Sequence, residues 1–224
     1  MKLLSTILVA SLVILTTIAH SSESDDSVVI VEKAIKLYEG GKEQQEQAIS
    51  LFLQAAEAGN ARAHFYLGQA HFTGKGVVQD EEKAIDWHKK AAKLGKGESS
   101  MTLAVTYLSK KNTKEAVKWL RTGSDQGVQL ASQTLGEIYF SGHEDIEPDF
   151  EEANKLFRLS AEQGSLQAKI YLAINYLNGL GVEKNLVKCN EWAVNAKSQA
   201  GSPNSSATSQ NNDMIKQLLD KCPA

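Results

Sequence analysis

Residues 61–77, ARAHFYLGQAHFTGKGV, decide the fold, because the pattern in this stretch returns along the chain. An apolar and a small residue, Leu67-Gly68, lie three positions ahead of His71 on an expected first helix. The glycine-rich turn 74–76 ends that helix, and a second helix completes a 36-residue unit at residues 61–96. Repeats of this length predict a stacked helical array, because one helix pair cannot bury its apolar stripe alone.

The same places recur in further units. The first helices carry Leu103-Ala104 with Tyr107, Leu135-Gly136 with Tyr139, and Leu172-Ala173 with Tyr176, and Tyr38 fits the aromatic place of a degenerate first unit. Near its start, each second helix carries a small residue: Ala48, Ala84, Ala116, Ala153 and Cys189. Three positions later comes a large residue: Leu51, Trp87, Trp119, Leu156 and Trp192. Four positions further on comes another small residue: Ala55, Ala91, Gly123, Ser160 and Ala196. Small residues let helices approach closely while the large ones fill the gap, so we expect the tryptophans in the core.

Helix boundaries follow from capping chemistry. Asp80 precedes two acidic residues, as at the start of a helix. A glycine just past a helix end takes the left-handed conformation easily, and Gly59, Gly95, Gly127 and Gly164 lie there, with Ala200-Gly201 in the last unit. Strand signals are scarce. We therefore predict an all-α fold of about five helix-turn-helix repeats, at residues 28–60, 61–96, 97–128, 129–165 and 166–201.

These residues resemble the Sel-one-like repeat family, a relative of the tetratricopeptide repeats. The second unit matches nearly throughout, with His71 in place of the usual Tyr, whereas the third unit is four residues shorter in its turn. The resemblance implies a right-handed α-α superhelix, a solenoid whose first helices line a concave face. It also implies an adaptor or scaffold role, which in exported bacterial members includes envelope signalling, host interaction and immunity against toxins.

The first residues have the pattern of a secretory signal peptide. Lys2 precedes an apolar run from Leu3 to Ile18, and small residues at Ala19 to Ser21 favour cleavage there. An uncleaved membrane anchor is the alternative, although sixteen residues are short for a span. We predict a signal peptide at 1–21, a disordered stretch at 22–27 and a periplasmic or secreted chain without a membrane span after cleavage.

The two cysteines, Cys189 and Cys222, both remain after such cleavage. An even count in an exported protein favours a disulfide, and free thiols in separate helices are the alternative. A polar linker begins at residue 202, and Met214, Ile215, Leu218 and Leu219 then give a helical period. We expect 202–224 to form this linker and a capping helix over Asp213 to Lys221, tied down by the disulfide.

The sequence offers little catalytic chemistry. His64 and His71 lie two turns apart on one helix, about 10 Å, which is too far for two ligands of one zinc without a third group. His143 lies in a turn, and no nucleophile motif or phosphate-binding loop is present. Acidic and basic residues are mixed, with a net charge of −3, so a nucleic-acid partner is not expected. We expect no enzyme activity, cofactor or metal, and keep a hydrolase of cell-wall or small-molecule substrates as the alternative.

The prediction for function is a protein-protein interaction scaffold or adaptor whose partner protein lies on the concave face. Phe65 and Phe72 are candidate anchors, with packing against a neighbouring helix as their alternative role. The candidate binding residues all belong to first helices: Arg62, Phe65, Gln69, Phe72, Thr102, Val105, Thr106, Gln133, Glu137, Lys169 and Asn175.

Overall fold

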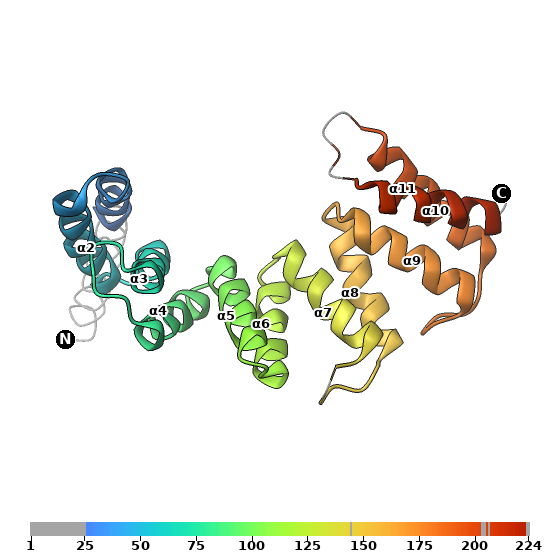
Figure 1. The fold of residues 1–224 in the computed structure, drawn as a ribbon, viewed down its shortest axis with the longest axis horizontal. Helices are drawn as coiled ribbons and strands as arrows, with labels where there is room; N and C mark the ends of the chain where they lie inside the picture. The colour runs from blue at the N-terminus through green and yellow to red at the C-terminus, as the bar shows by residue number, and fades with distance from the viewer. Residues whose placement is uncertain (1–25, 144, 203–204, 206, 223–224) are drawn as a thin grey trace, which may run out of the picture. The chain divides into compact units, whose positions relative to one another are not determined.

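The computed structural model describes residues 26–143, 145–202, 205 and 207–222. These residues form helices and no strand, with one isolated bridge between His143 and Ile146 (Figure 1). The all-α prediction is therefore confirmed. A helix over residues 26–38 is followed by α2 (Lys42–Glu57), α3 (Ala61–Thr73), α4 (Glu81–Lys93), α5 (Gly97–Ser109), α6 (Thr113–Asp125), α7 (Gln129–Ser141), α8 (Phe150–Glu162), α9 (Leu166–Asn178), α10 (Leu186–Ala200) and α11 (Ser209–Lys221).

The chain divides into an N-terminal unit, residues 1–99, and a C-terminal unit, residues 100–224. In the N-terminal unit, α3 packs on α2 and α4. In the C-terminal unit, α7 packs on α6 and α8, and α9 packs on α8, α10 and α11. Helices that follow one another in the sequence thus pack consecutively within each unit, as a repeat array requires.

The turns inside the second and fourth repeats are each closed by one residue that makes two hydrogen bonds. The Asp80 carboxylate accepts the Lys83 backbone N–H at 3.0 Å and caps α4, while the Asp80 backbone N–H donates to the His71 carbonyl at 2.9 Å. Asp149 repeats the arrangement at the start of α8, with the Tyr139 carbonyl at 2.7 Å. The cap and the aromatic place of the repeat are therefore bonded to each other through the backbone.

Two of the turns require glycine. Gly76 and Gly181 have φ values of +76° and +63°, which side chains rarely adopt. A Cβ atom on Gly76 would lie 2.8 Å from the Gln45 carbonyl oxygen, and one on Gly181 would lie 2.3 Å from the Phe150 carbonyl carbon. The glycine pairs of the sequence thus let a turn touch the preceding repeat.

The predicted glycine helix ends are confirmed in four repeats and differ in the last. The φ angles of Gly59, Gly95, Gly127 and Gly164 are all positive, whereas Gly201 has a φ of −81°. The chain after α10 leads to the cap instead of another first helix, so its exit differs.

The core pairs a small residue on a first helix with a large one on the second. A Cβ atom on Gly68 would lie 2.6 Å from the His88 ring, and one on Gly136 would lie 2.8 Å from the Phe157 ring. Phe52, His88, Leu120 and Phe157 occupy one repeat position, directly after the tryptophan place, and all four are fully buried.

The tryptophans themselves are only half-buried, which corrects the expectation that they fill the core. Trp87 and Trp119 lie at the edges of the N-terminal and C-terminal cores, respectively, and Trp192 lies at another edge of the C-terminal core. The position one residue later points at the small residue of the first helix, so it takes the central place.

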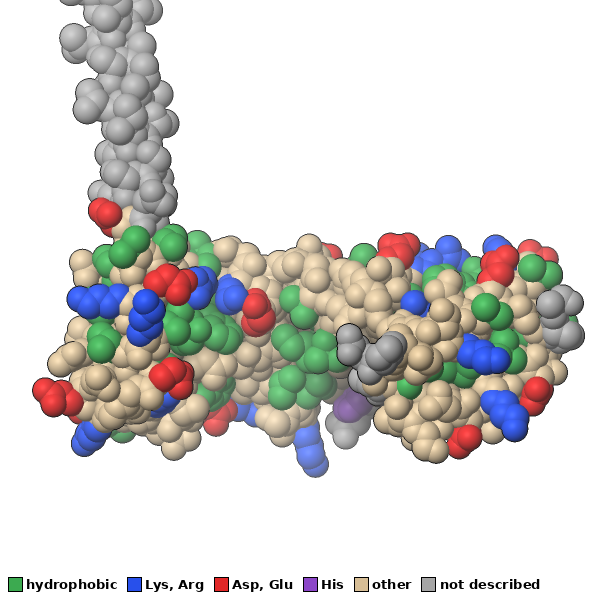
Figure 2. Space-filling model, turned by 90° about the horizontal axis from the view of Figure 1, so that it is seen from above, with side chains coloured by type: hydrophobic (Ala, Val, Ile, Leu, Met, Phe, Trp, Pro, Cys, Tyr) green, Lys and Arg blue, Asp and Glu red, His purple; other side chains and the backbone are tan. Residues whose placement is uncertain are grey.

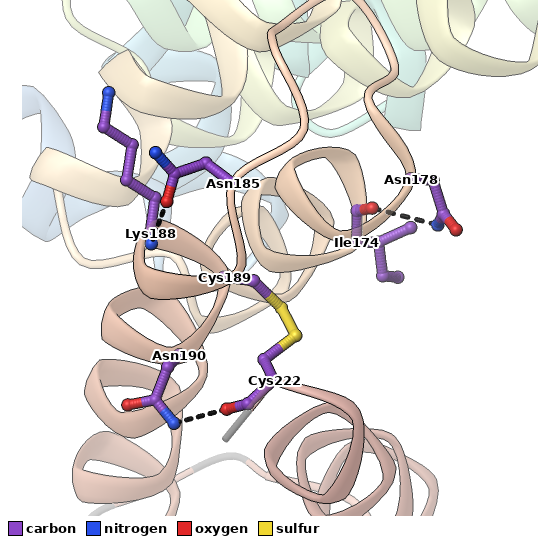
Figure 3. The surroundings of a disulfide bond; sticks show 7 residues. All are labelled: Ile174, Asn178, Asn185, Lys188, Cys189, Asn190 and Cys222. Atoms are coloured by element: carbon purple, nitrogen blue, oxygen red, sulfur yellow. Dashed lines mark hydrogen bonds between the residues drawn. A yellow bond between two sulfur atoms is a disulfide. The ribbon is translucent and has the colours of Figure 1, made fainter. Parts of the chain in front are cut away.

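A disulfide joins Cys189 on α10 to Cys222 at the end of α11, with the two Cα atoms 5.9 Å apart (Figure 3). The Asn190 side chain adds a hydrogen bond, donating from Nδ2 to the Cys222 carbonyl at 2.6 Å. Ile215 and Leu218 of α11 are buried in the same cluster as Ile170 of α9. The last helix thus covers the final repeat as the capping model predicts.

The first helix and the capping helix both begin earlier in the sequence than expected. The signal-peptide prediction and residues 22–25 lie outside the described residues, but residues 26 and 27, expected to be disordered, are helical. Ser27 is buried and its Oγ accepts a hydrogen bond from Asn60 Nδ2 at 3.1 Å. The capping helix begins at Ser209 instead of Asp213, because Thr208 and Asn211 form a capping box.

Candidate functional site

The predicted binding residues all lie on first helices, α3, α5, α7 and α9. Four belong to the N-terminal unit, and the other seven belong to the C-terminal unit. Each unit therefore carries its own portion of the first-helix face.

In the N-terminal unit, Phe65 and Phe72 pack on the second helix of their own repeat. The Phe65 ring lies edge-on to His88 at 5.5 Å, and the Phe72 ring stacks on His88 at 5.4 Å between centroids. Both phenylalanines are half-buried. Part of each ring therefore packs against a neighbouring helix, which is the alternative role that the sequence allows.

His88 is the central ring of this cluster. Its side chain is buried, its Nδ1 lies 3.2 Å from Ser99 Oγ, and its Nε2 has no hydrogen-bond partner among the described residues. Burial disfavours the charged imidazolium and lowers the pKa of His88 to about 4. The ring is therefore neutral at pH 7 and fills the place that Phe157 fills in the fourth repeat.

Arg62 and Gln69 lie on the outer side of α3. The Arg62 guanidinium donates to the Glu32 carboxylate, which raises the pKa of Arg62, and both side chains stay about half exposed. An exposed ion pair of this kind contributes little stability. Gln69 is half-buried, and its backbone carbonyl accepts a hydrogen bond from Thr73 Oγ1 at 2.8 Å. Both side chains remain accessible on the face of α3.

On α5, the candidate with the largest exposure is Val105, with 53% of its surface accessible. Thr102 and Thr106 are half-buried, and Thr106 Oγ1 donates to the Thr102 carbonyl at 2.9 Å. An exposed valine flanked by threonines makes this part of the face mildly apolar.

On α7, Gln133 and Glu137 form the middle of a hydrogen-bonded row. Ser165 Oγ donates to Gln133 Oε1 at 2.8 Å, and Gln133 Nε2 donates to Glu137 Oε1 at 3.0 Å. The row links the start of α9 to the face of α7 and fixes the orientation of both α7 side chains.

Lys169 on α9 reaches across to the next helix. Its Nζ donates to Gln199 Oε1 at 2.8 Å and lies 3.5 Å from Asn195 Oδ1. Partial burial lowers the pKa of Lys169. The ammonium group is thus held by two carboxamides at the junction of α9 and α10.

Asn175 is placed differently from its prediction, because none of its surface is exposed. Its Nδ2 donates to Asn154 Oδ1 at 2.9 Å, and Asn154 in turn donates to the Leu180 carbonyl at 2.7 Å. In the repeat register, Asn175 occupies the place of Ala70, Thr106 and Ile138, of which Ala70 and Ile138 are buried and Thr106 is half-buried. Strict use of the register would have placed Asn175 in the core, so it is left out of the binding face.

A polar pocket of about 200 Å³ lies beside Gln133 and was missed in the sequence. Five carboxamide side chains converge on it from four helices, and the sequence signal was a glutamine four residues before Gln133 at the start of α7. The lining residues are Gln129, Gln133, Gly164, Ser165, Leu166, Gln167, Gln199 and Asn211.

A second pocket, of about 650 Å³, lies at the turn between α7 and α8 and is lined by four acidic residues, Asp145, Glu147, Asp149 and Glu151, beside Tyr139 and Phe150. The Asp149 carboxylate caps α8, and Asp145 lies 3.7 Å from Lys114 Nζ. Among the described residues its lining contains carboxylates and a tyrosine and no His, Ser or Cys.

The histidines do not gather into a metal site. In the part of the chain that the structure describes, no three His, Cys, Asp or Glu side chains are placed to hold a metal ion. His64 Nδ1 bonds to the Asn60 carbonyl at 2.9 Å, and the exposed His143 lies 2.9 Å from Thr113 Oγ1. The first contact lies at the start of α3, and the second joins the start of α6 to the turn after α7.

Charges of both signs are interspersed over both units on the face shown in Figure 2. Several are paired across neighbouring repeats, as in Arg121 with Glu152 at 2.8 Å. Arg121 also donates to the Tyr139 hydroxyl at 3.1 Å. None of the helices in the described residues is both long and apolar enough to cross a membrane.

Two solved structures share this architecture. A Sel1 repeat protein from Oxalobacter formigenes aligns with a TM-score of 0.59 and 25% identity, over 78% of this chain and 77% of that one. A protective antigen of uropathogenic Escherichia coli strains, described as displaying an SLR fold, aligns with a TM-score of 0.61 and 25% identity, over 88% of this chain and 46% of that one.

Among sequence relatives, DAP3-binding cell death enhancer 1 of Rattus norvegicus is 32% identical over 153 residues, which is 63% of this chain. The chain matches only 29% of the length of that rat protein and 30% of the mouse protein of the same name. The likeness therefore concerns less than a third of each of those longer proteins.

The model of the Sel1 repeat matches five times, at residues 34–60, 61–96, 106–128, 134–165 and 166–199, which together cover more than half of the sequence. The matches follow the helix pairs of the structure in register. The chain belongs to the Sel1 repeat family.

Proposed function

We propose that this chain is a non-enzymatic scaffold that binds a partner protein on the face of its first helices. The observation that carries the proposal is a difference between the two helices of a repeat: second helices supply large buried residues to the core, and first helices keep accessible side chains. The first helices α3, α5 and α7 keep accessible side chains, such as Arg62, Val105 and Glu137. Packed helix pairs with accessible side chains on their first helices suit the recognition of another protein.

The chemistry of this face fits a protein surface. Exposed apolar side chains, Val105 and Leu130, stand beside hydrogen-bonding ones, Gln133 and Glu137, and all four come from α5 and α7. Protein interfaces combine such apolar contacts with polar groups that fix orientation.

An exported location is part of this proposal. The buried disulfide between Cys189 and Cys222 fits a chain that folds in an oxidising compartment, because cytosolic thiols are kept reduced. The signal-peptide pattern at 1–21 supports the same location from the sequence. We therefore propose a periplasmic or secreted scaffold.

The test uses a matched pair of valines. Val105 on the first helix α5 and Val194 on the second helix α10 are exposed to 53% and 50%. The tagged full chain, expressed in its native host and chemically crosslinked, is expected to capture one or a few proteins. Val105→Asp should reduce that capture at least tenfold and Val194→Asp should leave it within twofold.

Two results would contradict the proposal. Equal capture by both aspartate variants would show that the partner does not bind on the first-helix face. Turnover of a substrate without a captured protein would show that the chain is an enzyme and not a scaffold. A toxin-immunity role is the narrower form of the proposal. It requires that the captured protein is a toxin and that cells producing this chain survive it.

A further inference from the structure

The pocket of about 200 Å³ between α7, α9, α10 and α11 is named here the carboxamide pocket. Its lining includes five side-chain carboxamides, from Gln129, Gln133, Gln167, Gln199 and Asn211. A carboxamide offers two N–H donors and a carbonyl oxygen with two lone pairs, so it can pair with both the N–H donor and the carbonyl acceptor of a peptide group. Because they converge on one small pocket, a ligand there would meet several hydrogen-bond donors and acceptors at once.

The carboxamides are held in place by the repeat backbone. Gln129 Nε2 donates to the Gln163 carbonyl at 2.9 Å, and Gln199 Nε2 donates to the Gly164 carbonyl at 2.6 Å. Asn211 Nδ2 donates to Gln167 Oε1 at 3.0 Å. Side chains fixed in this way lose little conformational entropy when a ligand binds.

Bonding positions are left over after these contacts. The Gln129 side chain makes one hydrogen bond among the described residues and can make up to four. Gln199 donates one of its two N–H groups, and its Oε1 accepts from Lys169. The pocket is therefore ordered and still able to donate and accept.

The lining restricts the class of ligand. It holds no Lys, Arg, Asp or Glu, but one charge of each sign is bonded to it: the Glu137 carboxylate accepts from Gln133 at 3.0 Å, and the Lys169 ammonium donates to Gln199 at 2.8 Å. A ligand with a net charge of either sign would therefore meet a like charge beside the pocket. The lining also lacks an aromatic ring, the flat apolar surface on which a sugar ring packs. A neutral group with both donors and acceptors fits these conditions best.

We propose that the carboxamide pocket binds a peptide group in the backbone of an extended, uncharged segment of a partner protein. The volume equals that of about six to seven liquid water molecules at ~30 Å³ each, enough for one peptide group with its flanking Cα atoms. The inference rests on the proposed scaffold function and names the part of a partner that the C-terminal unit recognises.

The probe is a capped diglycine, N-acetyl-glycyl-glycine N′-methylamide, which offers backbone groups and no side chains. Titrated into the ¹⁵N-labelled full chain, it should shift the side-chain NH₂ resonances of Gln129, Gln167 and Asn211 in a saturable way. Sodium acetate and maltose serve as the anionic and carbohydrate probes. A larger, saturable response to either of these would overturn the peptide assignment.

The variant Gln129→Met/Gln167→Met keeps side chains of similar shape and removes two carboxamides. It should raise the Kd of the capped diglycine at least fivefold. Gln47→Met/Gln54→Met is the matched control, because both of these glutamines are exposed on α2. It should leave that Kd unchanged within twofold, and backbone amide spectra check that both variants are folded.

Failure of the inference differs from failure of the scaffold function. If the chain captures a protein and the capped diglycine shifts no pocket resonance, the inference is wrong and the scaffold proposal stands. An equal Kd for the pocket variant and wild type would have the same meaning. If Val105→Asp and Val194→Asp capture equally, the scaffold proposal fails first.

Discussion

The N-terminal and C-terminal units solve the same packing problem with different side chains. In the second repeat, Gly68 faces the ring of His88, and in the fourth repeat, Gly136 faces the ring of Phe157 at nearly the same separation. The third repeat uses the pair Ala104 and Leu120, both fully buried. The small and the large side chain of each pair thus fill the space between the two helices together, and the chemistry of the large side chain differs from repeat to repeat.

The units also differ in how the described helices are secured. The C-terminal unit carries a disulfide between α10 and α11, whereas the N-terminal unit relies on rings such as Tyr38, Phe52 and Tyr66. Phe52 and Tyr66 stack at 5.0 Å, as do Phe157 and Tyr171 at 4.6 Å in the C-terminal unit. The aromatic stack is therefore shared, and the titratable ring and the disulfide distinguish the two units.

The largest expected effect is the removal of the buried ring in the fourth repeat. Phe157→Ala should lower the free energy of unfolding of the C-terminal unit by about 3–5 kcal/mol, because it leaves a cavity opposite Gly136. Urea unfolding measures the loss. Leu159→Ala, at an exposed position on the same helix, should cost under ~1 kcal/mol. Equal losses in the two variants would contradict the central place of Phe157.

Removal of the disulfide should weaken the cap of the C-terminal unit alone. For cysteines 33 residues apart, the chain-entropy model gives about 4 kcal/mol. Cys189→Ala/Cys222→Ala should therefore speed hydrogen exchange in α11 and leave exchange in α3 and α4 unchanged. Mass analysis of the exported chain before and after reduction checks that the bond forms, and two free thiols would contradict the capping model.

The titratable ring should make the stability of the N-terminal unit depend on pH. The pKa of His88 falls from an ordinary 6.5 to about 4 on folding, so the unfolded chain takes up a proton before the folded one does. Stability is then complete above pH 6.5 and is lost as the pH falls toward 4, by about 3 kcal/mol.

The variant His88→Phe separates this effect from the titration of carboxylates. It places in the second repeat the ring of the fourth, and the difference in unfolding free energy between wild type and variant should change between pH 7 and pH 4. A difference that stays constant over this range would show that His88 does not titrate on unfolding.

The smallest expected effect sharpens the comparison with the third repeat. Gly136→Ala should cost about 1–2 kcal/mol, because its Cβ would lie 2.8 Å from the Phe157 ring. Adding Phe157→Leu imitates the Ala104 and Leu120 pair and should recover at least ~1 kcal/mol in a double-mutant cycle. Additive losses would mean that these two positions are not coupled.

The repeat register predicts much of the fold from the sequence. The caps at Asp80, the glycine turn 74–76 and the helix pairs follow from local chemistry, which needs no knowledge of distant contacts. The half-buried tryptophans were not predicted, because the register shows which positions repeat and leaves open which of two neighbouring large residues points inward. For Asn175 the register does hold a signal, because its counterparts Ala70 and Ile138 are apolar in the sequence and indicate a buried position.

The binding face is less accessible to sequence reasoning. Gln133 and Lys169 stand out as polar residues on first helices, but the carboxamide pocket also needs Gln199 from α10 and Asn211 from α11. Those two positions belong to a second helix and to the cap, so they meet Gln133 only through tertiary packing. No period in the sequence connects them.

The most direct test of the central claim is hydrogen–deuterium exchange of the full chain with and without its captured partner protein. We predict slower exchange in α7 and α9, around Gln133, Glu137 and Lys169, with α8 unchanged. Protection confined to the second helices, or no protection anywhere in a confirmed complex, would contradict binding on the first-helix face.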